Sequence, residues 1–225
     1  MTNGEWIYVN RQDYMPDRMR MEGIINKVHV ILRPKGLTFQ SQLIGSGNRN
    51  MVTTQIGSNT GYDFDYNLEL QYVPKDCSAK QIKDLIRDAF REALAGSKYN
   101  DPEDSTSVLT IKLTDTKKKI IVHSFDFAII YHDDEGNVHY LHHDKNRGSY
   151  GFQNRGYRFD EREYVQEIKD FYVDGWGLIR DEYLKLKNSN GDSTKHSYNL
   201  YVEAVKNVHN QMIGRPDYLR TISFI

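Results

Sequence analysis

The chain has 225 residues, a formal net charge of −1 and 38% hydrophobic residues, which is typical of a folded globular protein. It has no apolar run near the roughly 20 residues that span a bilayer and no signal-peptide pattern at its start, so we expect no membrane partner. Cys77 is the single cysteine, which excludes an internal disulfide and favours the reducing cytoplasm. The near-neutral charge argues against a binder of long nucleic acid, because only Lys117–Lys119 form a compact basic run.

The hydrophobic spacing predicts an α+β protein whose last third is helical. In chain order we expect a helix over residues 18–32, strands over 37–44 and 62–73, a helix from Ser78 to Gly96, strands over 107–113 and 119–131, and a hairpin strand over 138–141. From about residue 161 the pattern turns helical, so residues 1–158 are predicted to form a mixed core and residues 159–225 a helical subdomain.

Two aspartates mark the strand over residues 62–73. Asp63 and Asp65 share one face of this strand, about 7 Å apart, while Phe64 and Tyr66 share the other. Their mutual repulsion is about 2 kcal/mol at an effective dielectric constant near 20. Aspartate is also depleted in strands, so we expect a bound cation, and oxygen ligands of this kind suit Mg²⁺.

A third carboxylate, Asp126, lies in the middle of the apolar strand over residues 119–131. An unpaired charge there would cost several kcal/mol or would shift its pKa until the group is neutral. A metal shared with carboxylates on an adjacent strand would remove that cost. Asp63, Asp65 and Asp126 together therefore predict a site for two metal ions.

These residues resemble the DNA polymerase β-type nucleotidyltransferases, in the branch of cyclic GMP–AMP synthase, 2′-5′-oligoadenylate synthase and bacterial cyclic-oligonucleotide synthases. The resemblance rests on Gly45-Ser46, the Asp63/Asp65 strand and Asp126 in a later buried strand. It implies a mixed sheet flanked by helices and two Mg²⁺ (or Mn²⁺) ions held by the three aspartates, with Asp126 helping to activate the attacking hydroxyl.

The resemblance also implies that the turn at Gly45 and Ser46 binds the nucleotide phosphates, since glycine permits close approach and a helix start favours anions. Arg49 could pair with a phosphate or form a structural ion pair. The distance from Ser46 to Asp63 is longer than usual in this family, and Gly57-Ser58 lies nearer. Gly45-Ser46 is preferred because it directly follows an apolar strand end.

Two other groups of residues have alternative interpretations. The run His142-His143-Asp144 contains a dipeptide that resembles one of metal-dependent phosphohydrolases, but the preferred interpretation is a polar rim of the hairpin. Tyr150, Phe152 and Tyr157 could form an aromatic wall for a base, although a packed linker between the two parts of the chain is preferred.

The expected activity is transfer of a nucleoside monophosphate from an NTP to a hydroxyl of a nucleotide or small acceptor, with release of pyrophosphate. The product would be a cyclic or short oligonucleotide. Alternatives are nucleotidylation of a protein or an RNA end, a phosphohydrolase, and a regulatory protein that binds nucleotides without catalysis.

Overall fold

The computed structural model describes residues 4–156, 159–192 and 194–215, and the chain divides into two compact units. The larger unit comprises residues 8–156, and the smaller one joins residues 4–7 to the helices that follow residue 158. The boundary predicted after residue 158 lies next to residues 157–158, which are outside the described residues. Each unit is described by itself.

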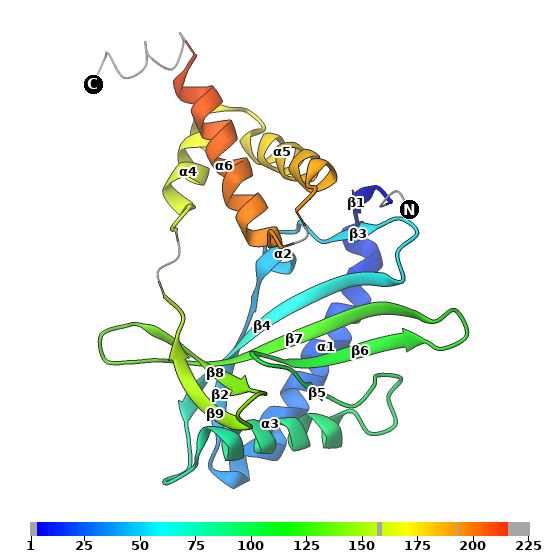
Figure 1. Ribbon diagram of the computed structural model, residues 1–225, viewed down its shortest axis with the longest axis vertical. Helices are drawn as coiled ribbons and strands as arrows, with labels where there is room; N and C mark the ends of the chain where they lie inside the picture. Colours follow the sequence, from blue (N-terminus) through cyan, green and yellow to red (C-terminus); the bar gives the residue numbers. More distant parts are fainter. Residues whose placement is uncertain (1–3, 157–158, 193, 216–225) are drawn as a thin grey trace. The chain divides into compact units, whose positions relative to one another are not determined.

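The larger unit is a mixed sheet with helices (Figure 1). Its elements, together with the strand that leads into it, are β1 (Trp6–Tyr8), α1 (Arg11–Leu32), the short 3-10 helix η1 (Arg33–Lys35), β2 (Thr38–Ile44), α2 (Gly45–Asn48), β3 (Thr53–Gln55), β4 (Thr60–Tyr72), α3 (Ala79–Ala93), β5 (Glu103–Asp104), β6 (Leu109–Asp115), β7 (Ile120–His132), β8 (Val138–Asp144) and β9 (Ser149–Asn154).

Five strands of the main sheet follow the order β2-β4-β7-β6-β5, and β8 pairs with the end of β7 and with β9. The central pair β4–β7 is parallel, whereas β2–β4, β6–β7 and the outer pairs are antiparallel. This arrangement confirms the predicted α+β class with a mixed sheet flanked by helices.

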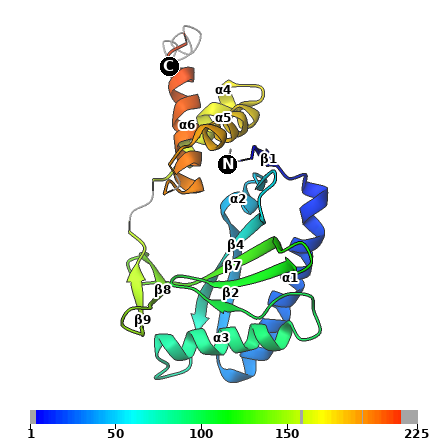
Figure 2. The same cartoon turned by 45° about the vertical axis from the view of Figure 1, so that its right-hand side comes forward.

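The helices α1 and α3 lie on one face of the sheet (Figure 2). Ser78 caps α3 as predicted: the Gln81 N–H donates to its hydroxyl, and the Ser78 N–H donates to the Gln81 side chain. Helix α1 begins at Arg11, before the predicted residue 18, and includes Pro16. Proline is tolerated best close to a helix start, and the buried Tyr14 fixes this first part of the helix to the core.

The core beneath these helices is built from the apolar face of β4 and β7. Phe64 stacks on Phe125 with ring centroids 5.3 Å apart, and Tyr66 stacks on Phe127 at 5.6 Å. Phe64, Phe125 and Phe127 are completely buried. The side chains of α1 and α3 complete this apolar layer.

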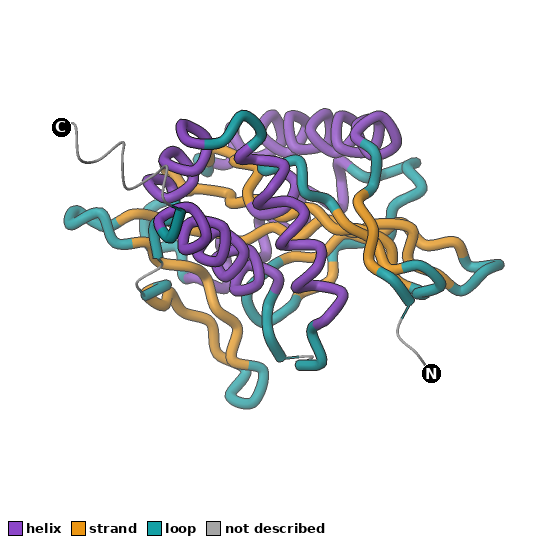
Figure 3. The backbone as a smooth tube through the Cα atoms, turned by 90° about the horizontal axis from the view of Figure 1, so that it is seen from above, coloured by secondary structure: helices purple, strands orange, loops and turns teal. Residues whose placement is uncertain are grey.

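The segment after residue 148 is a strand rather than the predicted linker. β9 pairs with β8, and both are drawn as orange strands in Figure 3. In the register of this pair, Phe152 lies opposite Leu141 and Tyr150 lies opposite His143. Tyr150 and Phe152 pack against the core, so they form no free aromatic wall, and Tyr157 lies outside the described residues. The glycines at 148 and 151 concealed the period of two in this segment.

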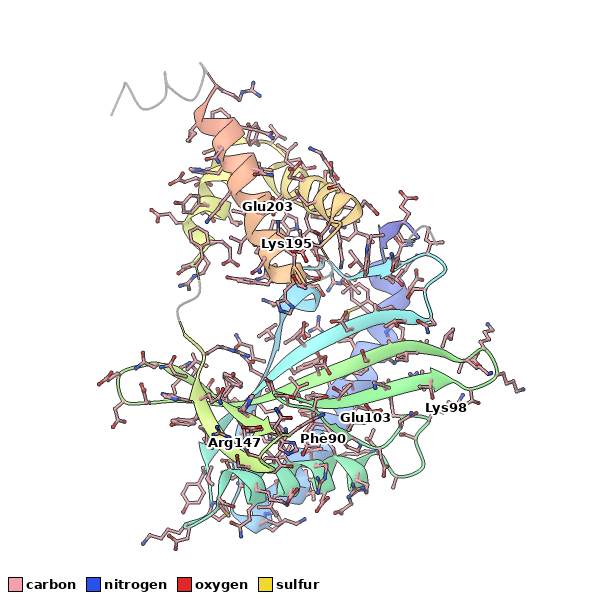
Figure 4. All side chains as sticks on the ribbon, viewed as in Figure 1. Phe90, Lys98, Glu103, Arg147, Lys195 and Glu203 are labelled. Atoms are coloured by element: carbon pink, nitrogen blue, oxygen red, sulfur yellow. The ribbon has the colours of Figure 1, made fainter. Side chains whose placement is uncertain are left out.

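The smaller unit contains the helices α4 (Arg162–Phe171), α5 (Gly175–Ser189) and α6 (Ser197–Ile213), as the helical pattern predicts. Residues 4–7 belong to it because the Trp6 N–H donates to the Asn188 side-chain oxygen at 2.8 Å. The ion pair of Lys195 and Glu203, both labelled in Figure 4, fixes the start of α6. Across the described parts of the chain, no helix is both long and apolar enough to cross a membrane.

Candidate functional site

The three aspartates singled out from the sequence come from two paired parallel strands. Asp65 in β4 is the register partner of Asp126 in β7, and Asp63 is the partner of Ser124. Register partners project from the same face of a sheet, so the carboxylates of Asp65 and Asp126 are direct neighbours. Asp63 stands two residues along on the same face. The structure thus brings all three residues to one area, on the face opposite the stacked aromatic rings.

The electrostatics of Asp65 reflect this crowding. Burial, together with the negative charges of Asp63 and Asp126, raises the pKa of Asp65 to about 7. The cations of Arg155 and Arg49 act in the opposite direction. Because half-buried carboxylates repel one another here, this face binds a proton or a cation more readily than isolated aspartates would.

Asp126 has a hydrogen-bond donor beside it. The Thr110 hydroxyl, on β6, donates to Asp126 Oδ1 over 2.5 Å. Burial raises the pKa of Asp126, the Thr110 hydrogen bond lowers it, and the charge of Asp63 raises it. The nearest cation on β6, Lys112, forms an ion pair with Glu103 at 2.6 Å; Glu103 is labelled in Figure 4.

The turn at Gly45 lies against the same carboxylates. Ile44, the last residue of β2, is the register partner of Asp65, and α2 begins at the next residue. Gly45 has a φ of +63°, and a Cβ atom there would lie 2.5 Å from Asp65 Oδ2. A side chain at position 45 would therefore displace the carboxylate, and only glycine allows this approach.

The other residues predicted to bind phosphate are Ser46, Arg49 and the alternative pair Gly57-Ser58. Ser46 follows Gly45 in α2, and Arg49, directly after α2, is close enough for its charge to lower the pKa of Asp65. Gly57-Ser58 lies in the exposed turn before β4, where a Cβ on Gly57 would meet nothing within 4 Å. The contact with Asp65 therefore distinguishes the turn at Gly45 from the one at Gly57.

Sequence reasoning missed three polar residues of this area, namely Thr110, Asn67 and Arg155. Asn67 follows Asp65 on the same face of β4, and the Arg155 guanidinium donates to its side-chain oxygen at 3.4 Å. Asn67 and Thr110 each lie between two apolar or aromatic residues, on the polar face of an alternating strand, a signal that could have been read from the sequence. Arg155 follows the missed strand β9, so its position depends on a pairing that was not predicted.

The donor set fits hard divalent cations, which prefer carboxylate oxygens. The register of Asp65 with Asp126, with Asp63 two residues along on the same face, is the observation that supports this fit. Burial and the two neighbouring charges raise the pKa of Asp65 in this arrangement. Within residues 4–156, 159–192 and 194–215, however, no three acidic, histidine or cysteine side chains are arranged closely enough to hold a metal ion.

The histidine-rich hairpin has structural contacts of its own. The His143 ring stacks on Tyr150 with centroids 4.0 Å apart, and its Nδ1 lies 3.5 Å from Asp104. Asp104 also accepts a hydrogen bond from the Tyr150 hydroxyl and pairs with the buried Lys83 at 2.6 Å. His143 thus belongs to a cluster that fixes β9 to α3, consistent with the polar hairpin rim.

No family model matches the chain, and no curated protein matches it in sequence. Solved structures do match. CdnG, a CD-NTase of Bradyrhizobium diazoefficiens in complex with GTP, matches with a TM-score of 0.57 and 12% identity over 93% of this chain and 68% of that one. CdnC of E. coli MS115-1 with ATP matches with a TM-score of 0.50 and 12% identity over 91% of this chain and 62% of that one.

A third match is the cyclic AMP-GMP synthase DncV of Vibrio cholerae, in complex with a linear intermediate. Its TM-score is 0.52 at 15% identity, over 81% of this chain and 50% of that one. The chain therefore spans about half of the length of DncV. At these identities the likeness concerns the fold. The chain has the polymerase β-type nucleotidyltransferase fold, as it is found in bacterial cyclic-oligonucleotide synthases.

Proposed function

We propose that the chain is a divalent-metal-dependent nucleotidyltransferase. It transfers a nucleoside monophosphate from an NTP to a hydroxyl of a nucleotide or another small acceptor, and the product is a cyclic or short oligonucleotide. The observation that supports this most is the register of Asp65 with Asp126, with Asp63 on the same face and Gly45 against the Asp65 carboxylate. Carboxylates on two neighbouring strands, beside a turn that admits close approach, suit a metal-bound triphosphate.

In the proposed reaction, the acceptor hydroxyl attacks the α-phosphorus, the bond to the β-phosphate breaks, and pyrophosphate leaves with the bonding electrons. Asp126 accepts the hydroxyl proton and passes it to solvent. Asp63 and Asp65, together with Asp126, would hold two Mg²⁺ or Mn²⁺ ions. Such ions, when bound, neutralise the triphosphate and the charge that develops on the attacking and leaving oxygens.

The turn at Gly45 and Ser46 is proposed to orient the triphosphate. Its backbone amides and the Ser46 hydroxyl offer donors, and the absence of a side chain at Gly45 leaves room next to Asp65. Arg49 is proposed to bind a phosphate oxygen, since its charge already acts at Asp65. These residues would orient the triphosphate, and positioning of the reacting groups is a main source of catalysis in phosphoryl transfer.

The test is incubation of the purified chain with each NTP, alone and in pairs, in the presence of Mg²⁺ or Mn²⁺. Mass spectrometry of the products should show pyrophosphate and a linear or cyclic oligonucleotide. Asp65→Asn is the matched inactive control because it removes one charge with little change in shape. Release of inorganic phosphate without a new nucleotide bond would instead identify a phosphohydrolase.

A second function, nucleotide binding without catalysis, is favoured by the side-chain positions: among the described residues no three candidate ligands are arranged to hold a metal ion. A protein of this kind would bind an NTP equally well with and without Mg²⁺. It would form no product in the same assay, so a titration with and without EDTA separates the two functions.

A further inference from the structure

We infer that Thr110 is a positioning residue that fixes the orientation of the Asp126 carboxylate, which would hold a metal ion; this rests on the proposed function. The hydrogen bond is direct, from the Thr110 hydroxyl to Asp126 Oδ1 at 2.5 Å. Thr110 and Asp126 are register partners in the antiparallel pair β6–β7, so the backbone itself sets this distance. Thr110 is 9% exposed, and little water reaches its side chain.

The surroundings of Thr110 explain why a hydroxyl performs this role. A lysine or arginine at position 110 would place a cation where a metal ion must bind, and would compete with it. The nearest lysine on β6, Lys112, is instead engaged by Glu103 at 2.6 Å. A neutral donor fixes one carboxylate oxygen and leaves the charge of the group intact. Asp126 Oδ2 would then remain available to hold a metal ion.

Donors that orient a metal ligand affect metal affinity strongly. Their removal commonly costs roughly 10–100-fold in metal affinity or in activity. The branched side chain of threonine also has restricted rotamers, so its hydroxyl is held in place at little cost in entropy. We therefore expect the hydroxyl, rather than the volume of the side chain, to determine how well Asp126 binds a cation.

The test compares Thr110→Val, which removes the hydroxyl at nearly constant volume, with Thr110→Ser, which keeps it. Mn²⁺ binding is followed by the electron paramagnetic resonance signal of free Mn²⁺, with the α,β-methylene analogues of ATP and GTP present to prevent turnover. Thr110→Val should weaken Mn²⁺ binding roughly 10-fold or more, and Thr110→Ser should stay close to wild type. Thr110→Ala gives the same readout if Thr110→Val does not fold.

Thr114→Val is the matched control. Thr114 lies on the same strand and donates a hydroxyl hydrogen bond at 3.2 Å, but its acceptor is Asn100. Its replacement should lower the unfolding midpoint without changing Mn²⁺ affinity. In an Asp126→Asn background, Thr110→Val should have no further effect on Mn²⁺ binding, because the two residues act through one ligand.

The outcomes separate this inference from the function on which it rests. A wild-type protein that binds no Mn²⁺ with either analogue would overturn the metal site and the role of Thr110 together. A wild-type protein that binds Mn²⁺, with a folded Thr110→Val variant that binds it equally well, would overturn the role of Thr110 alone. If Thr110→Val lowered Mn²⁺ affinity equally in the wild-type and Asp126→Asn backgrounds, the role of Thr110 would also be contradicted. Such a result would show that the substitution acts through an indirect structural effect.

Discussion

The two faces of the strand pair β4–β7 carry opposite chemistry in the same register. On the helix-covered face, Phe64 stacks on Phe125 with ring planes inclined by 16°. On the other face, the next register pair along the strands places Asp65 beside Asp126. Neighbouring rings attract each other, and neighbouring carboxylates repel each other. One backbone arrangement therefore provides both the most favourable packing and an unfavourable concentration of charge.

The comparison indicates how the fold can hold several carboxylates close together. The backbone ladder of β4 and β7 sets the separation of the strands, and packing on the aromatic face holds them there, so the carboxylates cannot move apart to relieve their repulsion. Substitutions on the two faces should consequently have opposite effects on the free energy of unfolding. Aromatic truncation should destabilise the chain, whereas removal of a carboxylate charge should leave the metal-free chain as stable as before or more so.

The largest effect is expected from Phe125→Ala. Phe125 is completely buried, and truncation of such a ring commonly costs about 3–5 kcal/mol in the free energy of unfolding. Urea denaturation followed by circular dichroism measures this cost. A loss below about 1 kcal/mol would show that the aromatic stack does not fix the strand pair.

Asp126→Asn should have nearly as large an effect, but on turnover instead of stability. We expect the rate of pyrophosphate release to fall roughly 100–1,000-fold, equivalent to about 3–4 kcal/mol of transition-state stabilisation. The free energy of unfolding without metal should not decrease. Asp134→Asn, a change at an exposed turn aspartate, is the control and should leave the rate unchanged. An active Asp126→Asn variant would exclude the proposed role of this residue.

An intermediate effect is expected from pH. The pKa of Asp65 is about 7 in the folded chain, against 3.8 for an ordinary aspartate, so the folded state holds a proton that the unfolded state has released between these values. The metal-free chain should therefore lose stability progressively as pH rises from about 4 to 7, because the folded state then releases the proton on Asp65. Asp65→Asn should remove that contribution.

Thermal unfolding of wild type and Asp65→Asn at several pH values measures the difference between the two proteins. Mg²⁺ should stabilise the wild type more at pH 7.5 than at pH 5, because the proton competes with the cation for the carboxylate. A difference between the two proteins that does not change with pH would contradict the raised pKa.

The smallest effect is expected from Ser46→Ala. Loss of one hydrogen bond to a phosphate should weaken binding of a non-hydrolysable NTP by about 1 kcal/mol, or roughly fivefold. Isothermal titration calorimetry measures this change, and Ser58→Ala is the matched control in the other Gly-Ser pair. A larger effect from Ser58→Ala would transfer the phosphate role to Gly57-Ser58.

The sequence pattern predicted the features that depend on residues close together in the chain, such as helices, caps and the alternating faces of strands. The aspartates were found because a strand alternates its faces and because Asp126 is isolated among apolar residues. The register of β4 with β7 was not predictable, since a local pattern does not say which distant strand is the partner. Thr110 and Arg155 were missed for the same reason: their proximity to the carboxylates arises from pairing across β6 and β9.

The parallel pairing of β4 with β7 also has a consequence for the order of folding. Helix α3 and the strands β5 and β6 separate the two in the chain, because parallel strands can be joined only by a long crossover connection. During synthesis, Asp63 and Asp65 leave the ribosome well before Asp126. Because distant contacts are slow to form, the carboxylates should come together in a late step, and Mn²⁺ uptake should lag behind helix formation in refolding.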